Sequence, residues 1–176
     1  MPKSSLSWTE SYDKPLQYGT AVSAAKKGIC MSIYEAERDG VLLTNDPDKI
    51  DLEAVCDLIG KQYWGPSRVR RTTKKAFENS YSFVLLRDGV LVGCARVVTD
   101  FATCAYIEDV VVDDSLRGMG IGQWMIGEIM NCPDCAEQHR WLLMTVDAQT
   151  FYEKLGFHAP GHPNWIMEKT KPYPTE

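Results

Sequence analysis

One stretch decides the fold of this 176-residue chain: Val110-Val111-Val112-Asp113-Asp114-Ser115-Leu116-Arg117-Gly118-Met119-Gly120-Ile121-Gly122-Gln123. An apolar strand runs into a loop with three alternate glycines, and the loop opens a helix. Glycine has no Cβ, so the backbone can turn sharply here and bring N–H groups close to a ligand. The helix start adds unpaired N–H donors and the positive end of a dipole. The stretch therefore predicts a cradle for a phosphate or pyrophosphate.

Two familiar phosphate-binding motifs do not explain this loop. A dinucleotide fingerprint requires G-x-G-x-x-G among parallel strands, whereas the spacing here is G-x-G-x-G and hairpins are expected before it. A Walker loop continues with Lys and then Ser or Thr, whereas Gly122 is followed by Gln123. A tight strand-to-helix connection with idle glycines is the structural alternative.

Strands and turns precede the glycine loop. The dipeptides Asp39-Gly40 and Asp88-Gly89 fit type I′ turns, so each predicts a β-hairpin. The paired strands are expected at residues 32–38 and 41–44, and at residues 81–86 and 90–99. Residues 104–112 are rich in β-branched side chains and predict one more strand, which ends at the loop.

Helices are expected between the hairpins and after the loop. After Asp46-Pro47-Asp48, apolar residues recur at helical spacing and predict a helix that ends near Trp64-Gly65-Pro66. A second short helix is expected at residues 73–79, capped by a threonine hydroxyl. Beyond the loop and its helix we expect a buried strand at 141–146, a short helix at 149–155 and a last strand at 165–169. This order predicts an α/β fold with a mixed, largely antiparallel sheet flanked by helices.

Composition narrows the class of protein. The 24 acidic and 19 basic side chains leave a net charge of −5, which argues against a nucleic-acid binder held by bulk electrostatics. No apolar run reaches the roughly 18 residues of a membrane span, and acidic residues near the N-terminus argue against a signal or transit peptide. We expect a cytoplasmic protein with no nucleic-acid or membrane partner. Residues 31–176 should form one domain, preceded by an arm over residues 1–30.

The six cysteines are expected to be free thiols, because nothing in the sequence indicates secretion. Cys132 and Cys135 form a C-x-x-C pair followed by His139, which could supply three metal ligands. A structural zinc site usually needs four, and no second pair is nearby. A redox pair would favour a helix N-terminus, whereas this pair follows a helix C-terminus. We interpret the pair as a loop and expect no metal.

Two motifs in register resemble those of the GNAT acetyltransferase superfamily. Arg117-Gly118-Met119-Gly120-Ile121-Gly122 is similar to its acyl-CoA signature, R/Q-x-x-G-x-G/A. Phe151-Tyr152-Glu153-Lys154-Leu155-Gly156-Phe157 resembles its Y-E-K-x-G-F segment. The resemblance implies a V-shaped splay between the strand that ends at Val112 and the strand at 141–146, with acetyl-CoA as the cosubstrate.

The resemblance also implies which residues hold acetyl-CoA. The backbone of the strand before the loop would pair with the pantetheine arm, and the loop amides would hold the pyrophosphate. The implied cofactor-binding residues are Val110, Val111, Val112, Arg117, Gly118, Met119, Gly120, Ile121, Gly122, Gln123, Phe151 and Tyr152.

Two residues are expected to carry the chemistry. An acceptor ammonium must lose a proton before it attacks the thioester, and the departing thiolate should gain one. By resemblance Tyr152 lies near the sulfur as the acid, the alternative being a core tyrosine. Period 2 places Glu108 on the sheet face of Val110, as the base or a positioning group, and Asp109 on the opposite face. Arg96, in mid-strand, needs a partner, which either carboxylate could be.

The loop between the first two helices would cover the acceptor site. Its Tyr63 and Trp64 could form an aromatic wall or a lid on the core, and Asp147 could contact cofactor or acceptor. The expected substrate-binding residues are Tyr63, Trp64, Arg96, Glu108 and Asp147. A basic run is either a solvated face or a contact for the CoA 3′-phosphate or an acceptor anion: Arg68, Arg70, Arg71, Lys74 and Lys75.

Together these expectations indicate an N-acetyltransferase. It would move acetyl from acetyl-CoA to a primary amine of a small molecule or peptide by direct transfer in a ternary complex, and by analogy it could form a homodimer. One alternative is a CoA-binding sensor or interaction module without transferase activity. Another is an amino-sugar phosphate N-acetyltransferase, which residues 107–112 resemble. Many members of that group have an asparagine before the Y-E-K helix, whereas this chain has Asp147-Ala148-Gln149-Thr150, so we do not adopt that sugar.

Overall fold

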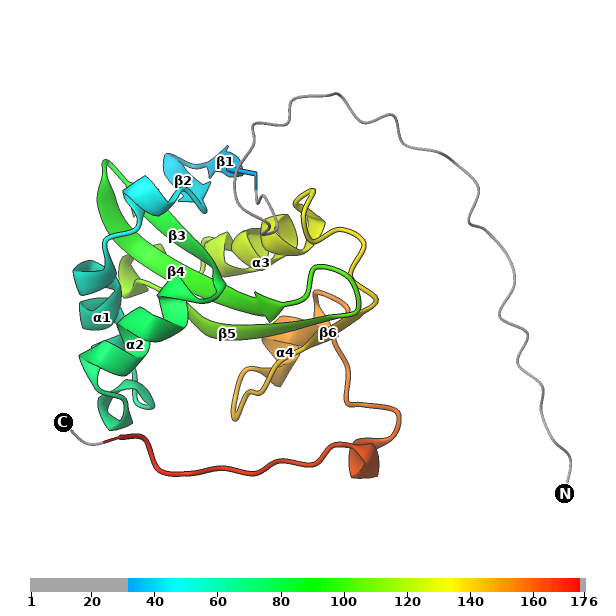
Figure 1. Cartoon of the computed structure of the whole chain (residues 1–176). Helices are drawn as coiled ribbons and strands as arrows, with labels where there is room; N and C mark the ends of the chain where they lie inside the picture. Colours follow the sequence, from blue (N-terminus) through cyan, green and yellow to red (C-terminus); the bar gives the residue numbers. More distant parts are fainter. Residues whose placement is uncertain (1–31, 175–176) are drawn as a thin grey trace, which may run out of the picture. The chain divides into compact units, whose positions relative to one another are not determined.

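The structure, a computed structural model, describes residues 32–174, and the arm expected over residues 1–30 lies outside the described residues. A six-stranded sheet with the order β1-β2-β3-β4-β5-β6 forms its centre (Figure 1). The strands are β1 (Glu35–Arg38), β2 (Val41–Thr44), β3 (Tyr81–Arg87), β4 (Val90–Thr99), β5 (Cys104–Val112) and β6 (Arg140–Leu142). Neighbours run antiparallel except β5 and β6, which run parallel. The predicted α/β class is confirmed.

Both predicted hairpins are confirmed. Asp39 (φ 53°) and Gly40 (φ 72°) connect β1 to β2, and Asp88 (φ 52°) and Gly89 (φ 75°) connect β3 to β4. Left-handed backbone at both central positions is the type I′ geometry, whose twist matches that of the flanking strands. The two turn dipeptides therefore place four of the six strands.

Helices cover both faces of the sheet (Figure 1). The helices are α1 (Leu52–Gly60), α2 (Arg70–Glu78), α3 (Ile121–Asn131) and α4 (Gln149–Glu153), with short 3-10 turns η1 (Pro47–Lys49), η2 (Gly65–Ser67), η3 (Asp114–Leu116) and η4 (Pro163–Trp165). α1 and α2 pack on one face through Val55, Ile59 and Phe77, and α3 packs on the other through Met125 and Ile129. Within residues 32–174, none of the helices has the length and apolarity of a membrane span.

α1 ends earlier than the sequence predicts. Asp51 caps its start, because the carboxylate accepts hydrogen bonds from the N–H groups of the first turn. The helix ends at Gly60 instead of near Trp64. The chain then folds back so closely that a Cβ on Gly65 would collide with the carbonyl oxygen of Ile59. This close approach produces η2 in place of a further helical turn.

The predicted threonine cap of α2 is wrong. The helix starts at Arg70, and Val69 precedes it without a side-chain hydrogen bond. Thr73 lies inside the helix and is almost fully buried, and its hydroxyl accepts a hydrogen bond from Nε of Arg68 at 3.2 Å. The hydroxyl therefore orients an arginine instead of capping the helix.

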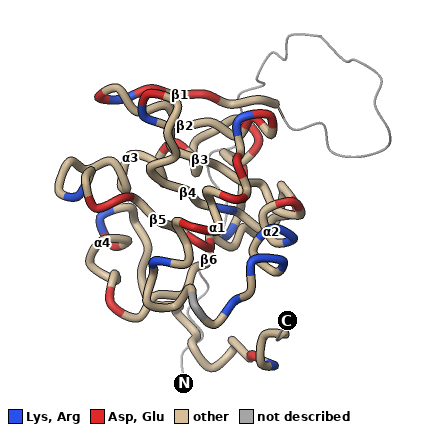
Figure 2. Tube along the Cα trace, turned by 90° about the vertical axis from the view of Figure 1, so that its left-hand side faces the viewer, with Lys and Arg blue, Asp and Glu red and all other residues tan. Residues whose placement is uncertain are grey.

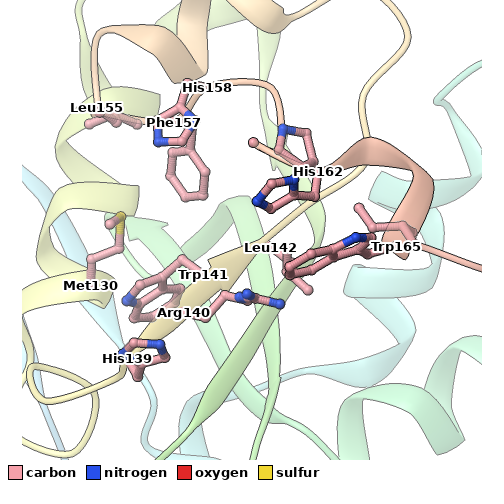
Figure 3. A pocket seen from close by; sticks show the side chains of 14 residues that line it. Met130, His139, Arg140, Trp141, Leu142, Leu155, Phe157, His158, His162 and Trp165 are labelled. Carbon is pink, nitrogen blue, oxygen red and sulfur yellow. The ribbon is translucent and has the colours of Figure 1, made fainter. Parts of the chain in front are cut away.

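Of the two strands predicted near the C-terminal end, the first forms only in part and the second does not form among the described residues. β6 covers only three residues and is partly exposed, so the strand expected at 141–146 ends at Leu142 and is not buried. No strand forms at 165–169 among the described residues. Residues 156–166 instead enclose a cavity of about 440 Å³ together with β6 (Figure 3). His139, His158 and His162 all line this cavity.

Candidate active site

The glycine loop ends in an uncapped helix start. Gly118 (φ 80°) and Gly120 (φ 73°) have left-handed backbone, which favours glycine. Gly120 is the N-cap residue of α3, and no side chain caps this end. The N–H groups of the first turn therefore lack an intrahelical partner. A Cβ on Gly118 would meet no atom within 4 Å, so the space beside the loop is open.

A cation that the sequence analysis did not single out lies beside this loop. Nη2 of Arg38, at the end of β1, would be 3.8 Å from a Cβ on Gly120. Arg117, which the motif implies as a cofactor-binding residue, is exposed and pairs with Asp114 at 2.5 Å. Arg38, whose Nε also pairs with the exposed Asp39 at 3.4 Å, therefore brings a guanidinium close to the helix start, and its hairpin is too distant in sequence for any local pattern to show this.

Phe151 connects the glycine loop to Tyr152. A Cβ on Gly122 would lie 3.3 Å from the ring of Phe151 and 3.6 Å from a methyl group of Val112. The bare Cα of Gly122 thus lets α4 approach the first turn of α3. The rings of Phe151 and Tyr152 then meet edge to face with their centres 4.8 Å apart.

The sheet opens between β5 and β6. The two strands pair at only three positions, where Cys104, Ala105 and Tyr106 face residues 140–142. From Ile107 onward β5 has no strand partner on that side within the described residues. The implied splay is therefore present, with a shorter β6 than expected. A cavity of about 590 Å³ lies there, lined by residues 106–110 and 144–148.

A bulge in β5 changes which way its carboxylates point. Asp109 has φ 54°, and the register shifts so that two residues of β5 oppose one of β4. Strict alternation is lost, and Glu108 and Asp109 both reach the guanidinium of Arg96. The prediction that Asp109 lies on the opposite face is therefore wrong, whereas the prediction that Arg96 has an acidic partner is confirmed twice over.

The two carboxylates differ in their exposure to solvent. The Asp109 side chain is 6% exposed and lies between two arginines, with Arg96 Nε at 2.5 Å and Arg68 Nη2 at 2.8 Å. The Glu108 side chain is 33% exposed and lines the cavity. Glu108 is therefore the carboxylate of this pair that is more exposed to a molecule in the cavity, while it also pairs with Arg96.

Tyr152 also lines this cavity. It is half-buried, and the removal of its phenol from water raises the pKa above the ordinary value of 10. The phenol therefore keeps its proton at neutral pH and can donate it.

Aromatic side chains surround the cavity. Tyr63 and Trp64 both line it. Tyr63 is 72% exposed and forms a wall, whereas Trp64 also packs on the core beneath α1 and α2. Tyr106 from β5 and Tyr173 from the C-terminal segment complete the ring-bearing surface. Asp147 lines the same cavity.

Acidic partners hold much of the predicted basic run. Figure 2 shows Lys and Arg residues gathered along α2. Arg70 and Lys74 pair with Glu53 of α1, and Arg70 also pairs with Asp57. The hydrogen bond from Arg70, with a smaller effect of the one from Lys74, lowers the pKa of Glu53 to about 2. These two cations therefore tie α1 to α2, while Arg68 turns inward to Asp109.

The C-x-x-C pair lies in the turn after α3. Both thiols are fully buried, and the Cys135 N–H donates to the Cys132 carbonyl at 2.9 Å. The described cysteines are free thiols, namely Cys56, Cys94, Cys104, Cys132 and Cys135. Residues 32–174 hold no group of three or more His, Cys, Asp or Glu side chains arranged to bind a metal ion.

The matches to known proteins cover this site. Residues 78–159, which include the glycine loop and Tyr152, match the sequence model of the acetyltransferase (GNAT) domain. A crystal structure of a protein assigned to the GNAT family, from Xanthomonas campestris pv. campestris, is 30% identical with a TM-score of 0.70. The match covers 75% of this chain and 94% of that chain. The chain belongs to the GNAT family.

Other GNAT relatives differ more in length or sequence. Histone acetyltransferase TAP1 of Glycine max is 31% identical over 128 residues, which cover 65% of this chain and 53% of that protein. This GNAT chain thus spans about half the length of that relative. A Clostridium acetobutylicum protein crystallised with acetyl-CoA is 14% identical with a TM-score of 0.55, covering 78% of this chain and 95% of that chain, a likeness of fold alone.

Six of the predicted site residues of this GNAT chain line one cavity. The predicted residues that line it are Tyr63, Trp64, Glu108, Val110, Asp147 and Tyr152. Arg96 lies beneath them, and Gly122 and Phe151 connect the cavity to the loop. The sequence analysis missed Arg38, Tyr106, Tyr173 and the inward turn of Arg68, because each depends on contacts between distant segments.

Proposed function

We propose that this chain is an acetyl-CoA-dependent N-acetyltransferase that acts by direct transfer to a primary amine of a small molecule or peptide. The contact between Gly122 and Phe151 carries the proposal. It joins an open anion cradle to Tyr152 at the unpaired edge of β5. No cysteine lines the cavity among the described residues, which supports direct transfer over an acyl-cysteine intermediate.

The chain's residues suit acetyl-CoA as the cosubstrate. The amides from Gly118 to Gln123 would bind the diphosphate, with the positive helix end and Arg38 adding attraction. The backbone of Val110, Val111 and Val112 has no β6 partner and would pair with the amides of the pantetheine arm.

The proposed reaction uses two side chains of the cavity. An acceptor ammonium gives its proton to the Glu108 carboxylate, directly or through water. The neutral nitrogen then forms a bond to the thioester carbonyl carbon, and the C–S bond breaks as the tetrahedral intermediate collapses. The departing thiolate takes the proton of the Tyr152 phenol. Solvent then moves one proton from Glu108 to Tyr152 and restores both groups.

Two measurements test the proposal together. Calorimetry should detect acetyl-CoA binding, and a thiol-release assay over a diverse amine library should detect turnover that the Tyr152→Phe variant loses. Binding without release from any amine would overturn the enzymatic proposal and favour a CoA-binding module. An absence of binding would overturn the assignment of the glycine loop as well.

A further inference from the structure

The cavity of about 590 Å³ beside β5, called the acceptor cavity below, has more acidic than basic side chains around it. Three carboxylates line it, those of Glu108, Asp109 and Asp147, and among the described lining residues Arg68 is the one cation. Arg96 lies beneath the cavity and pairs with two of these carboxylates. The three carboxylates and the two arginines together therefore give this cavity a net charge of −1.

Neither arginine is available to an anionic acceptor. Arg68 is 7% exposed, and it donates to Asp109 and to the hydroxyl of Thr73. Arg96 is 8% exposed and donates to Glu108 and Asp109. Turning either guanidinium toward a ligand would weaken the pairing of a buried Asp109 carboxylate, which is strongly unfavourable. A carboxylate or phosphate on the acceptor would thus meet no free positive charge here.

Asp147 is the remaining charged group. It lies between β6 and α4, on the wall of the splay opposite β5, and it is exposed. Among the described residues no ion pair involves it. The rings of Tyr63, Trp64, Tyr106 and Tyr173 share this cavity, and the faces of such rings attract cations.

We infer that the acceptor is a di- or polycationic amine that carries no carboxylate or phosphate. One amine reacts beside Glu108, and a second positive group lies against Asp147 and the aromatic wall. This inference rests on the proposed function and adds the charge class of its substrate.

Three four-carbon amines of matched length test the inference: 1,4-diaminobutane, butylamine and 4-aminobutanoate. They share one reacting amine and differ in the far end, which is cationic, apolar or anionic. With acetyl-CoA saturating, kcat/KM from thiol release should be greatest for the diamine and least for the amino acid. We expect a spread of roughly tenfold or more between these two, since each charge contact contributes about a fivefold factor.

Asp147→Asn identifies the source of the preference. The variant should raise KM for the diamine about fivefold and leave butylamine unchanged, so that the ratio between them collapses. Glu153→Gln, an exposed acid of α4 that does not line the cavity, is the matched control and should leave the ratio intact.

The outcomes separate this inference from the proposed function. A preference for 4-aminobutanoate, or an unchanged ratio in Asp147→Asn, overturns the cationic acceptor while the observed turnover supports the transferase. Turnover of other library amines but of none of these three also overturns the cationic acceptor and supports the transferase. Silence across the whole amine library, with acetyl-CoA bound, overturns the proposed function itself.

Discussion

At the scale of single residues, the raised pKa of Tyr152 and the exposure of Glu108 suit the proposed transfer. Burial raises the pKa of the Tyr152 phenol, so that it remains an acid at neutral pH. The Glu108 carboxylate reaches the cavity, whereas Asp109 is enclosed by arginines. In the proposed transfer these two adjacent acids thus have separate parts, Glu108 in proton transfer and Asp109 in pairing with the arginines.

Removing the phenol should slow the chemistry without weakening cosubstrate binding. In Tyr152→Phe we expect kcat to fall roughly 100-fold, within the range of general acid catalysis, with the acetyl-CoA Kd nearly unchanged. Because the pKa of Tyr152 is raised, the alkaline fall in wild-type kcat should lie above pH 10, and the variant should lack it. Steady-state kinetics across pH measure kcat, and calorimetry measures the acetyl-CoA Kd. A kcat profile that is unchanged in the variant would contradict the acid role.

Isosteric amide substitutions should separate the two acids by stability. Asp109→Asn leaves Arg68 and Arg96 without their buried counter-charge, so the free energy of unfolding should fall by about 3–5 kcal/mol. Glu108→Gln, at a partly exposed site, should lower it by less than about 1 kcal/mol and yet reduce kcat strongly. Urea unfolding and steady-state kinetics measure the two effects. Equal losses of stability would refute this division.

At the scale of elements, the site depends on how closely α3 and α4 approach. Gly122 lies in the first turn of α3, and the ring of Phe151 packs beside the position that a Cβ on Gly122 would occupy. Gly127, in the middle of the same helix, has open space at that position. The first glycine therefore serves the contact between elements, and the second does not.

Alanine at the two glycines should have opposite consequences. Gly127→Ala should raise the free energy of unfolding by about 0.5–1 kcal/mol, since alanine favours helix and meets no neighbour. Gly122→Ala should lack this gain and weaken acetyl-CoA binding several-fold, because its Cβ displaces Phe151 beside the loop. Thermal unfolding and calorimetry provide the comparison. Tight acetyl-CoA binding by Gly122→Ala would show that the Phe151 contact is dispensable.

The two hairpins, whose signals are local, were predicted correctly, whereas the local signal for a helix cap was not. Asp39-Gly40 and Asp88-Gly89 specify their turns by backbone preference alone, and the hairpins follow. Thr73 carried a capping signal, but tertiary packing assigned its hydroxyl to Arg68. The apolar run at 141–146 predicted a buried strand, whereas the splay leaves residues 143–146 without a strand partner among the described residues.

At the scale of the whole molecule, the acceptor cavity is assembled from distant parts of the chain. Its walls come from the turn before α2, from β5, from the segment between β6 and α4, and from Tyr173 in the C-terminal segment. Residues more than a hundred positions apart therefore share one surface. Substrate selection then depends on the packing of several elements and on no single motif.

Tyr173 tests the contribution of the C-terminal segment. Its side chain is half-exposed and lines the cavity, so Tyr173→Ala should raise KM for the acceptor several-fold and leave thermal stability and the acetyl-CoA Kd unchanged. Met167→Ala, at an exposed position outside the cavity, is the control and should change none of the three. An acceptor KM that is the same in both variants would remove the segment from the site.

The sequence by itself determined the family, the hairpins and the uncapped helix start, because glycine and turn residues restrict the backbone wherever they occur. It also indicated Tyr152 and Glu108 for the chemistry. Only the tertiary structure decided that a bulge at Asp109 turns two carboxylates to one arginine, and that Arg68 comes inward to join them. Such charges are paired by three-dimensional contact across separate strands and turns, and periodicity along one strand does not contain that information.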